Sequence, residues 1–359
     1  MSARVRGGRG PRRILVRCPN HVGDVVMATP GLEALRRAEP DALIVAQLPA
    51  TLIPLLESAG LVDELWPVES REEGWRALRR DVRRIAAARF ELGIAIPESI
   101  SSALLMRLGR VERVVGFARD PLRRALLHEV VPADPGWGRR RLVSRERFVL
   151  RLMQAVGAEA APGPPRLRLA TTSAEAERLD RVLRPLGLSL ARLVERPPVV
   201  LAPGAGFGDA KCWPAESFAA LGDRLAGVGD PIVLVGAKGE AERLAAVAGA
   251  MQSPPVVLAG LLDLGALKAL LRHARLLVAN DAGTRHLAAA FGVPSVVFFG
   301  PTSVAKTPDN LERVAVLETQ HDCRPCYLRD CPIDHRCLRE ISVERAFSAA
   351  SHIVSERES

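Results

Sequence analysis

The chain has 359 residues, of which 48% are hydrophobic and 25% are charged, and this length is too great for one ordinary core. It predicts two domains of about 150 residues each. The formal net charge of +9 is carried mainly by arginine, and no apolar run reaches the ~18 residues of a membrane span.

The first segment, MSARVRGGRGPRR, holds five arginines and no acidic residue. It lacks the apolar stretch of a secretory signal, so we interpret residues 1–12 as a solvated, disordered basic tail. The alternative is a tether to the anionic lipid of a membrane, which attracts basic residues. Nucleic acid is disfavoured as a partner because no aromatic residues are interleaved with the arginines. We expect a cytoplasmic protein, at most peripheral on the cytoplasmic face of the inner membrane.

Residues 13–195 alternate continuous apolar runs with helical patterns, which is typical of a parallel sheet covered on both faces. The expected strands are 13–18, 42–49, 63–68, 90–99 and 111–118. The expected helices are 25–38, 51–59, 71–88, 101–109 and 145–158, and one more lies among the prolines before residue 198. We place a domain boundary at about Glu195.

The alternation restarts at residue 196, with strands expected at 198–203, 230–236, 255–260, 275–280 and 294–300, each followed by a helix or loop. This second domain is expected to run to residue 345 and to contain a Cys-rich segment, 323–337. Residues 346–359 are expected to form a C-terminal helix and tail. The sequence therefore predicts an α/β protein with two doubly wound, Rossmann-like parallel-sheet domains facing a cleft.

Four groups of polar residues each follow an apolar strand, which is where open α/β sheets bind ligands. The groups are Asn20, His21, Gly23 and Asp24; Gly204, Gly206, Gly208 and Lys211; Glu240; and Asn280, Asp281, Gly283, Thr284 and His286. We expect all four groups to line the same cleft.

The loop GAGFGDAKCWP combines glycines, whose backbone can approach a phosphate closely, with the positive charge of Lys211. The alternative is a plain turn with a surface lysine. A dinucleotide fingerprint is disfavoured, because the spacing is G-x-G-x-G and no acidic residue ends the next strand.

In NDAGTRHLAAAFG, Asn280 or Asp281 could cap the following helix, whose start could also bind a pyrophosphate. His286 is either a ligand contact or a structural residue. Asp24, after the first strand, is either a helix cap or a general base. As a base, it would suit inverting glycosyl transfer, with cations stabilising the departing diphosphate on the other side of the sugar. No second carboxylate stands beside it at glycosidase spacing.

Three stretches together resemble glycosyltransferase family 9, the ADP-heptose:lipopolysaccharide heptosyltransferases, and look most like the heptosyltransferase II type. They are ILVRCPNHVGDVVMATPGLEALRR, LAPGAGFGDAKCWPAESFAAL and VANDAGTRHLAAAFGVPSVVFFGPTS. The resemblance implies the GT-B fold, with the acceptor on the N-terminal domain and ADP-heptose on the C-terminal one. It implies an enzyme that adds heptose to the inner core of lipopolysaccharide without a cofactor for catalysis.

Residue by residue, the resemblance implies that Asp24 is the base and that Asn20, His21 and Gly23 lie on the acceptor side. It implies donor binding by Gly204, Gly206, Lys211, Glu240, Asp281, Gly283 and His286. Ala282 departs from the family's D-[ST]-G-x-x-H motif, and we expect Thr284 to supply the missing hydroxyl. Six further arginines around the fifth strand are expected to contact the acidic acceptor or solvent: Arg107, Arg110, Arg113, Arg119, Arg123 and Arg124.

The segment HDCRPCYLRDCPIDHRC places two, four and five residues between Cys323, Cys326, Cys331 and Cys337. Four thiolates at this spacing predict a structural zinc site. Free thiols or disulfides, and an iron–sulfur cluster, are the alternatives. The resemblance does not decide among them, because some related proteins have such a segment and others lack it.

Three other functions stay open at this point. A transferase of the same fold could use another nucleotide sugar or another glycan acceptor. A GT-B epimerase would need no acceptor. A non-catalytic protein that binds sugar nucleotides would need no base, so the presence of both Asp24 and Lys211 argues against it.

Overall fold

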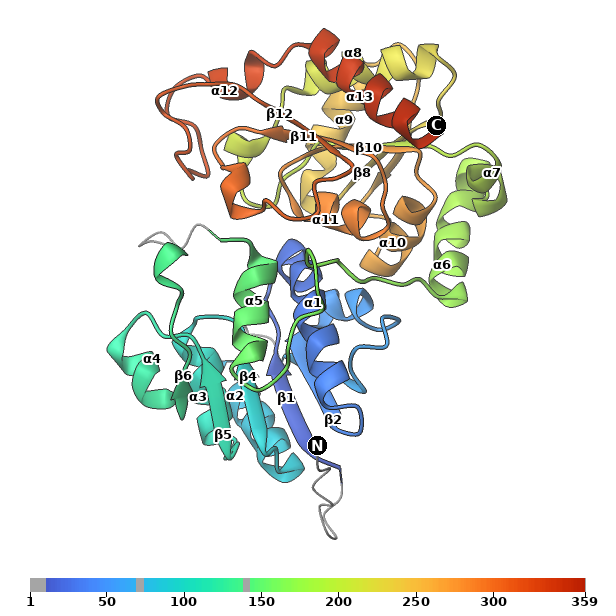
Figure 1. Ribbon diagram of the computed structural model, residues 1–359. Coiled ribbons are helices and arrows are strands. Elements are labelled where there is room, and N and C mark those ends of the chain that lie inside the picture. Colours follow the sequence, from blue (N-terminus) through green and yellow to red (C-terminus); the bar gives the residue numbers. More distant parts are fainter. Residues whose placement is uncertain (1–10, 69–73, 138–142, 359) are drawn as a thin grey trace. The chain divides into compact units, whose positions relative to one another are not determined.

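The computed structural model describes residues 11–68, 74–137 and 143–358 (Figure 1). The chain divides into two compact units, one up to Pro165 and the other from Arg166. Each unit is built around its own parallel sheet, and each sheet has six strands in the described residues.

The sheet of the first unit has the strand order β3-β2-β1-β4-β5-β6, so its direction of winding reverses between β1 and β4. Its strands are β1 (Arg13–Arg17), β2 (Leu43–Pro49), β3 (Glu64–Val68), β4 (Leu92–Ala95), β5 (Arg113–Gly116) and β6 (Glu129–Val130). Its α-helices are α1 (Val22–Ala38), α2 (Gly74–Ala88), α3 (Ile100–Leu108), α4 (Pro121–Leu126) and α5 (Arg145–Gln154).

The second unit repeats this topology with the order β12-β11-β10-β7-β8-β9 and reverses between β7 and β10. Its strands are β7 (Val199–Ala202), β8 (Ile232–Gly236), β9 (Val256–Ala259), β10 (Leu276–Asn280), β11 (Ser295–Phe299) and β12 (Val314–Glu318). Its α-helices are α6 (Ser173–Leu183), α7 (Leu190–Glu195), α8 (Ala215–Gly227), α9 (Ala241–Ala250), α10 (Leu264–Arg272), α11 (Gly283–Ala290), α12 (Arg336–Arg339) and α13 (Val343–Glu358).

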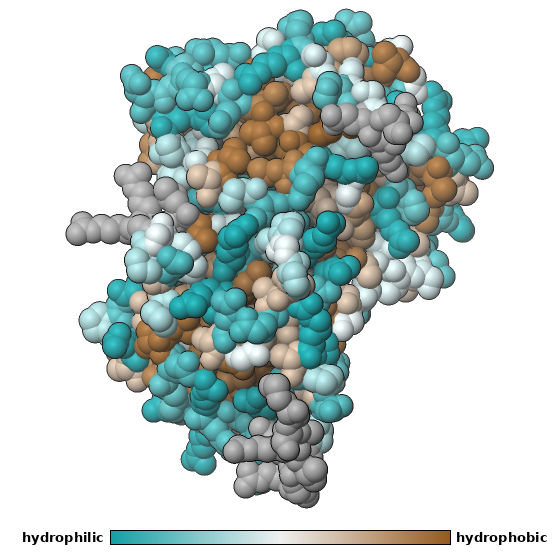
Figure 2. All heavy atoms as spheres, in the orientation of Figure 1, coloured by the Kyte–Doolittle hydropathy of each residue, from teal (hydrophilic) through white to brown (hydrophobic). Residues whose placement is uncertain are grey.

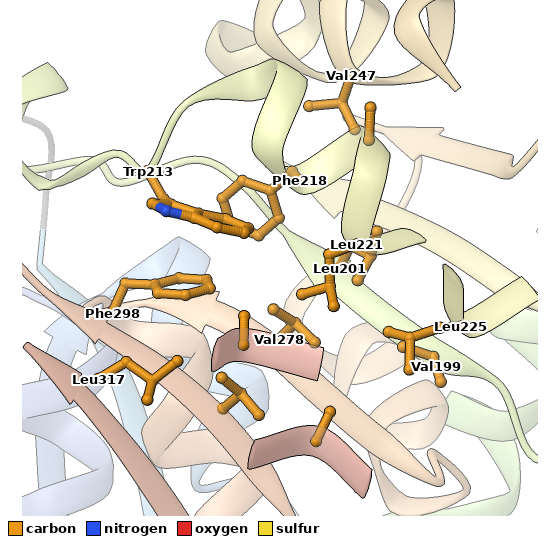
Figure 3. Packing of buried hydrophobic residues seen from close by; sticks show 14 of the residues in the cluster. Val199, Leu201, Trp213, Phe218, Leu221, Leu225, Val247, Val278, Phe298 and Leu317 are labelled. Carbon is orange, nitrogen blue, oxygen red and sulfur yellow. The ribbon is translucent and has the colours of Figure 1, made fainter. Parts of the chain in front are cut away.

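An aromatic cluster organises the core of the second unit (Figure 3). The ring of Trp213 stacks on Phe298 with centroids 4.2 Å apart, and Phe218 meets both rings edge-on. The indole N–H of Trp213 donates to the carbonyl of Ile341 at 3.0 Å, so this buried group is satisfied. Because Trp213 stands two residues after Lys211, the cluster anchors one end of the Gly-rich loop.

An apolar area marks the surface of the second unit where Figure 1 labels β12 and α13 (Figure 2). A groove there runs between the edge strand and the helix, and Val314, Leu317, Ala349 and Ile353 are among its lining residues. Within the described ranges, no helix is both long enough and apolar enough to cross a membrane.

The predicted α/β class with two doubly wound parallel sheets is confirmed. Residues 51–59 were expected to form an α-helix, but the structure has a 3₁₀ helix at Ala50–Leu55 instead. Four elements were not predicted from the sequence: the short α4 and β6, the second helix before residue 198 (α7) and the edge strand β12.

The division between the compact units also falls about thirty residues before the expected boundary at Glu195. The physical reason is that α6 packs against α10 of the second unit. A buried ion pair ties them together, with Lys268 Nζ 2.9 Å from the Glu175 carboxylate. Moving α6 away from α10 would leave one of these two buried charges without its partner, which is energetically costly, so α6 stays with the second unit.

Candidate functional site

Three of the four predicted polar groups meet at one edge of the second sheet. Strands β10, β7 and β8 are neighbours and parallel, so their carboxyl ends lie side by side. The loops that leave these ends carry Lys211, Glu240 and Asp281. This is the switch point of the sheet, where α/β proteins bind ligands.

Asp281 is the centre of a polar network at this edge. Lys211 Nζ lies 3.0 Å from its Oδ2 and donates to its main-chain carbonyl at 2.8 Å. Arg285 Nε donates to Oδ1 at 2.9 Å, and the Thr302 hydroxyl donates to Oδ2 at 2.7 Å. One carboxylate thus holds two cations and a hydroxyl from three different segments.

The network fixes the charge of Asp281. Burial alone would raise the pKa of this carboxyl, but the charges of Arg285 and Lys211 hold it well below its usual value. Hydrogen bonds from Thr302 and Lys211 act in the same direction. Asp281 is therefore ionised throughout the physiological range.

Neither Asn280 nor Asp281 caps α11, so the interpretation that one of them is the helix cap is wrong. The N-cap residue is Ala282, which has no side-chain oxygen to accept the first N–H groups. Asn280 instead joins two loops: its amide donates to the Pro203 carbonyl at 2.8 Å and accepts from the Trp213 N–H at 3.0 Å. The start of α11 consequently keeps N–H groups that no side chain caps, as an anion site requires.

Glu240 faces the Gly-rich loop. Its Oε2 accepts from the Ala237 N–H at 2.8 Å, which fixes the carboxylate over the backbone of Gly204. A Cβ atom on residue 204 would come within 2.2 Å of Oε1 of Glu240, so any other residue there would displace this carboxylate. Gly206, by contrast, has open space around the same position.

His286 and Thr284 both lie in the first turns of α11. His286 is buried, and this burial, with the nearby Arg285 charge second, holds its pKa well below the usual value. Its imidazole is therefore neutral. Thr284 is half-buried in the same turn as Gly283.

The Cys-rich segment packs directly on the Gly-rich loop. The Ala210 N–H donates to the Arg329 carbonyl at 2.9 Å. Gly208 has a φ of +151°, and a Cβ there would come within 2.4 Å of the same carbonyl oxygen. On the other side, the Tyr327 N–H donates to the Pro301 carbonyl at 3.0 Å, next to Thr302.

The four clustered cysteines do not fit a shared metal ion in this structure. All are free thiols, with Cys337 buried and Cys323 exposed. Burial raises the pKa of Cys337, and the three neighbouring thiols raise it further against the opposing charge of Arg324. Within the described residues, no three His, Cys, Asp or Glu side chains are placed to hold a metal. The donor set that the sequence predicts for zinc is present, but its tetrahedral arrangement is not.

The fourth polar group belongs to the first unit, at the switch point of its own sheet. Asp24 is not the cap of α1: the N-cap residue is His21, and Asp24 lies in the first helical turn. Its carboxylate is 30% exposed, and Oδ1 lies 3.7 Å from Arg145 Nε on α5. Before the helix, Asn20 Oδ1 accepts from Arg17 Nη2 at 2.5 Å, while Gly23 is buried. The geometry leaves the Asp24 carboxylate reachable by solvent and beside a cation.

Arg123, expected among the acceptor-side or solvated arginines, is wholly buried. Its guanidinium donates to the carbonyls of Phe117 and Ser99 and to the hydroxyl of Ser102, so it holds loops together instead. Arg107, Arg110, Arg119 and Arg124 are exposed, and Arg113 is half-buried.

Three residues of the site were not predicted as such: Thr302, Arg285 and Arg145. Thr302 follows β11, so the same polar-after-strand signal could have found it. Arg285 stands inside the DAGTRH motif. Arg145 carries no local signal, because its nearness to Asp24 depends on the packing of α5 against α1.

The fold and these groups define a protein of two Rossmann-like units. The second unit presents a lysine ammonium, a Gly-rich backbone and an uncapped helix start at one sheet edge, which suits a phosphorylated ligand. The first presents the solvent-reachable carboxylate of Asp24 at the corresponding edge, which suits proton abstraction.

Comparison with known proteins names the class. A model of glycosyltransferase family 9 (heptosyltransferase) matches residues 75–336. The lipopolysaccharide heptosyltransferase 2 of Salmonella typhimurium is 30% identical over 354 residues, which cover 96% of this chain and 99% of that protein. The structure of E. coli ADP-heptose LPS heptosyltransferase II matches with a TM-score of 0.78 at 26% identity, covering 97% of this chain and 100% of that one. The chain therefore belongs to glycosyltransferase family 9 and is a glycosyltransferase, which confirms the resemblance inferred from the sequence.

Proposed function

We propose that this enzyme transfers heptose from ADP-L-glycero-D-manno-heptose to the inner core of lipopolysaccharide, with inversion at the anomeric carbon. The observation that carries the proposal is the Lys211–Asp281 network at the switch point of the second sheet. The chain that contains this network matches a heptosyltransferase 2 over 99% of that protein's length. The network supplies the cation that a departing diphosphate needs.

In this mechanism the second unit holds the donor. Lys211 turns its ammonium from Asp281 toward the diphosphate, and the backbone of Gly204, Gly206 and Gly283 approaches the phosphate oxygens. Asp281 stays behind as the group that positions the ammonium. The negative charge that develops on the leaving ADP then falls beside a cation and a helix start.

The other donor contacts follow from the same geometry. Glu240 is fixed by the Ala237 N–H, so its second oxygen can accept from a hydroxyl of the nucleoside. His286 is neutral and can exchange a hydrogen bond without adding charge. Thr284 supplies the hydroxyl that Ala282 lacks.

The acceptor lies on the first unit in this proposal. Asp24 removes the proton of the attacking hydroxyl as the bond to the anomeric carbon forms. Asn20 and His21 lie on the acceptor side, just before the helix that carries Asp24. Gly23 has no side chain, so the backbone there can come close to the acceptor sugar. Nearby arginines attract the carboxylates and phosphates of the inner core.

Catalysis needs no cofactor in this scheme, and no step passes through a metal. The Cys-rich segment has a structural role: its backbone supports the Gly-rich loop through Arg329 and the loop after β11 through Tyr327. The enzyme works on the cytoplasmic face of the inner membrane, as a peripheral protein.

Replacing Lys211 by Gln should weaken ADP-heptose binding by about 10- to 100-fold, the value of one charge-assisted hydrogen bond to phosphate. Titration calorimetry with ADP-heptose measures this. Lys306→Gln is the matched control, because Lys306 is exposed and lies over the Tyr327 ring outside the network. Equal affinity in the Lys211 variant and the wild type would remove Lys211 from the donor site.

Donor competition tests the function itself. Purified enzyme is given a heptose-bearing lipopolysaccharide acceptor with ADP-heptose, ADP-glucose, UDP-glucose or GDP-mannose. The mass of the product is then measured by mass spectrometry. We expect transfer from ADP-heptose in preference to the others. Preference for another donor would favour the alternative of a same-fold transferase with a different sugar, and binding without transfer would favour a non-catalytic protein.

A further inference from the structure

The helices on one face of the first unit carry exposed apolar side chains that their own core does not use. Helix α2 exposes Trp75 by 60% and Leu78 by 40%, α3 exposes Ile100 by 38%, and α4 exposes Leu122 by 58%. Singly exposed apolar residues are ordinary, but several on helices that pack side by side can form a docking surface. Helix α2 packs against α3, and α3 packs against α4 (Figure 1).

These four side chains lie toward the same edge of the sheet. Helices α3 and α4 follow the carboxyl ends of β4 and β5, and α2 runs back from that edge to the start of β4. All three helices therefore begin at the carboxyl edge, and these four residues stand in the first turns of their helices, whereas the exposed Leu108 ends α3 at the opposite edge. Asp24, at the start of α1, belongs to this edge as well.

The surroundings of the apolar residues are basic. Helix α2 has five arginines and one acid, Asp81, which is buried. The guanidinium groups of Arg76 and Arg79 lie 5.8 Å and 4.6 Å from the centre of the Trp75 ring. Arg124 is exposed beside Leu122, and Arg119, also exposed, pairs with Glu98 at 3.1 Å. An exposed tryptophan framed by arginines is the pattern of a helix that lies at a membrane interface.

We infer that α2, α3 and α4 form a docking surface for an anionic phospholipid bilayer, which we call the basic apolar face. The arginines meet lipid phosphates while Trp75, Leu78, Ile100 and Leu122 enter the boundary between headgroups and acyl chains. Nucleic acid is the less suitable partner, because leucine and isoleucine side chains cannot stack on bases. The inference rests on the proposed function. Docking would hold Asp24 close to the bilayer surface, where the sugar of a lipid-anchored acceptor glycan could reach it.

The test is flotation of the full-length enzyme with vesicles of phosphatidylcholine alone or mixed with phosphatidylglycerol. We expect binding only to the anionic vesicles, lowered about fivefold by each of Arg76→Gln and Arg79→Gln. Trp75→Ala and Leu78→Ser together should lower it by roughly tenfold or more. Matched controls on the second unit are Val228→Ser and Arg184→Gln, whose side chains are 64% and 74% exposed.

Tryptophan fluorescence gives a second readout. Trp66 and Trp213 are buried, and Trp137 is half-buried against Phe117 and Phe148. A blue shift on anionic vesicles should therefore come mainly from the exposed Trp75 and disappear in Trp75→Phe. The inference is overturned if the wild type does not bind anionic vesicles, if the α2 variants bind them as well as the controls do, or if single-stranded RNA displaces the enzyme from the vesicles. ADP release with a detergent-dispersed acceptor is measured in parallel. Unchanged turnover in variants that no longer float separates loss of docking from failure of the proposed transfer.

Discussion

Asp24→Asn should lower acceptor-dependent ADP release by about 10²- to 10⁴-fold, the usual contribution of a general base. The amide keeps the shape of the side chain but cannot take a proton from the acceptor hydroxyl. Because Asp24 belongs to the first unit and the donor contacts belong to the second, ADP-heptose affinity should stay close to that of the wild type. Steady-state ADP release and calorimetry measure the two quantities separately.

Asp41→Asn is the matched control for this variant, since Asp41 is an exposed carboxylate of the same unit. Its turnover should equal that of the wild type. If Asp24→Asn also keeps full turnover, another group must take the proton and the assignment of the base is wrong. If it loses donor binding as well, the side chain has a role beyond proton abstraction.

Asp281→Asn should destabilise the protein by about 3–5 kcal/mol, the cost of leaving a buried charge without its partner. The change removes the only carboxylate that the described structure places on both Lys211 and Arg285. Arg285 is 1% exposed and cannot turn to water without disrupting α11. Urea unfolding at neutral pH measures the difference. Asp334→Asn, which breaks the exposed pair with Arg336, should change stability little.

The same residue predicts a pH dependence. The pKa of Asp281 is lower in the folded chain than in the unfolded one, so the unfolded chain binds more protons between the two values. The stabilisation is fully present above the unfolded pKa of about 4 and is lost as the pH falls below it. The gap in unfolding free energy between wild type and Asp281→Asn should therefore narrow on acidification. A gap that stays constant down to low pH would contradict the network.

The sequence was sufficient for the two sheets because their central strands are continuous apolar runs, such as the LLVA of β10 before the polar NDAG. It was not sufficient for β6 and β12. These are edge strands, of which β6 has only two residues and β12 is mostly half-buried, so neither produces a strong apolar run. The position of the unit boundary needed knowledge of a tertiary contact, the buried pair of Lys268 with Glu175.

The candidate site likewise has residues that the sequence predicts and residues whose positions depend on tertiary packing. Lys211 and Asp281 were predicted because each stands in the segment that follows a buried strand, and neighbouring parallel strands bring such segments together. That Thr302 would reach the Asp281 carboxylate required the order of β10 and β11 in the sheet. That Arg145 would face Asp24 required the packing of two helices distant in sequence. The zinc site was predicted from spacing alone, and spacing does not specify how the four thiols are directed.

The transfer of heptose is tested by ADP release from ADP-heptose by the wild-type enzyme, with and without Kdo-lipid A that already carries one heptose. We expect release that depends on the acceptor, with one added heptose for each ADP formed. ADP-heptose binding with no turnover on this acceptor would contradict the acceptor assignment. No binding of ADP-heptose at all would contradict the proposed donor site around Lys211 and Asp281.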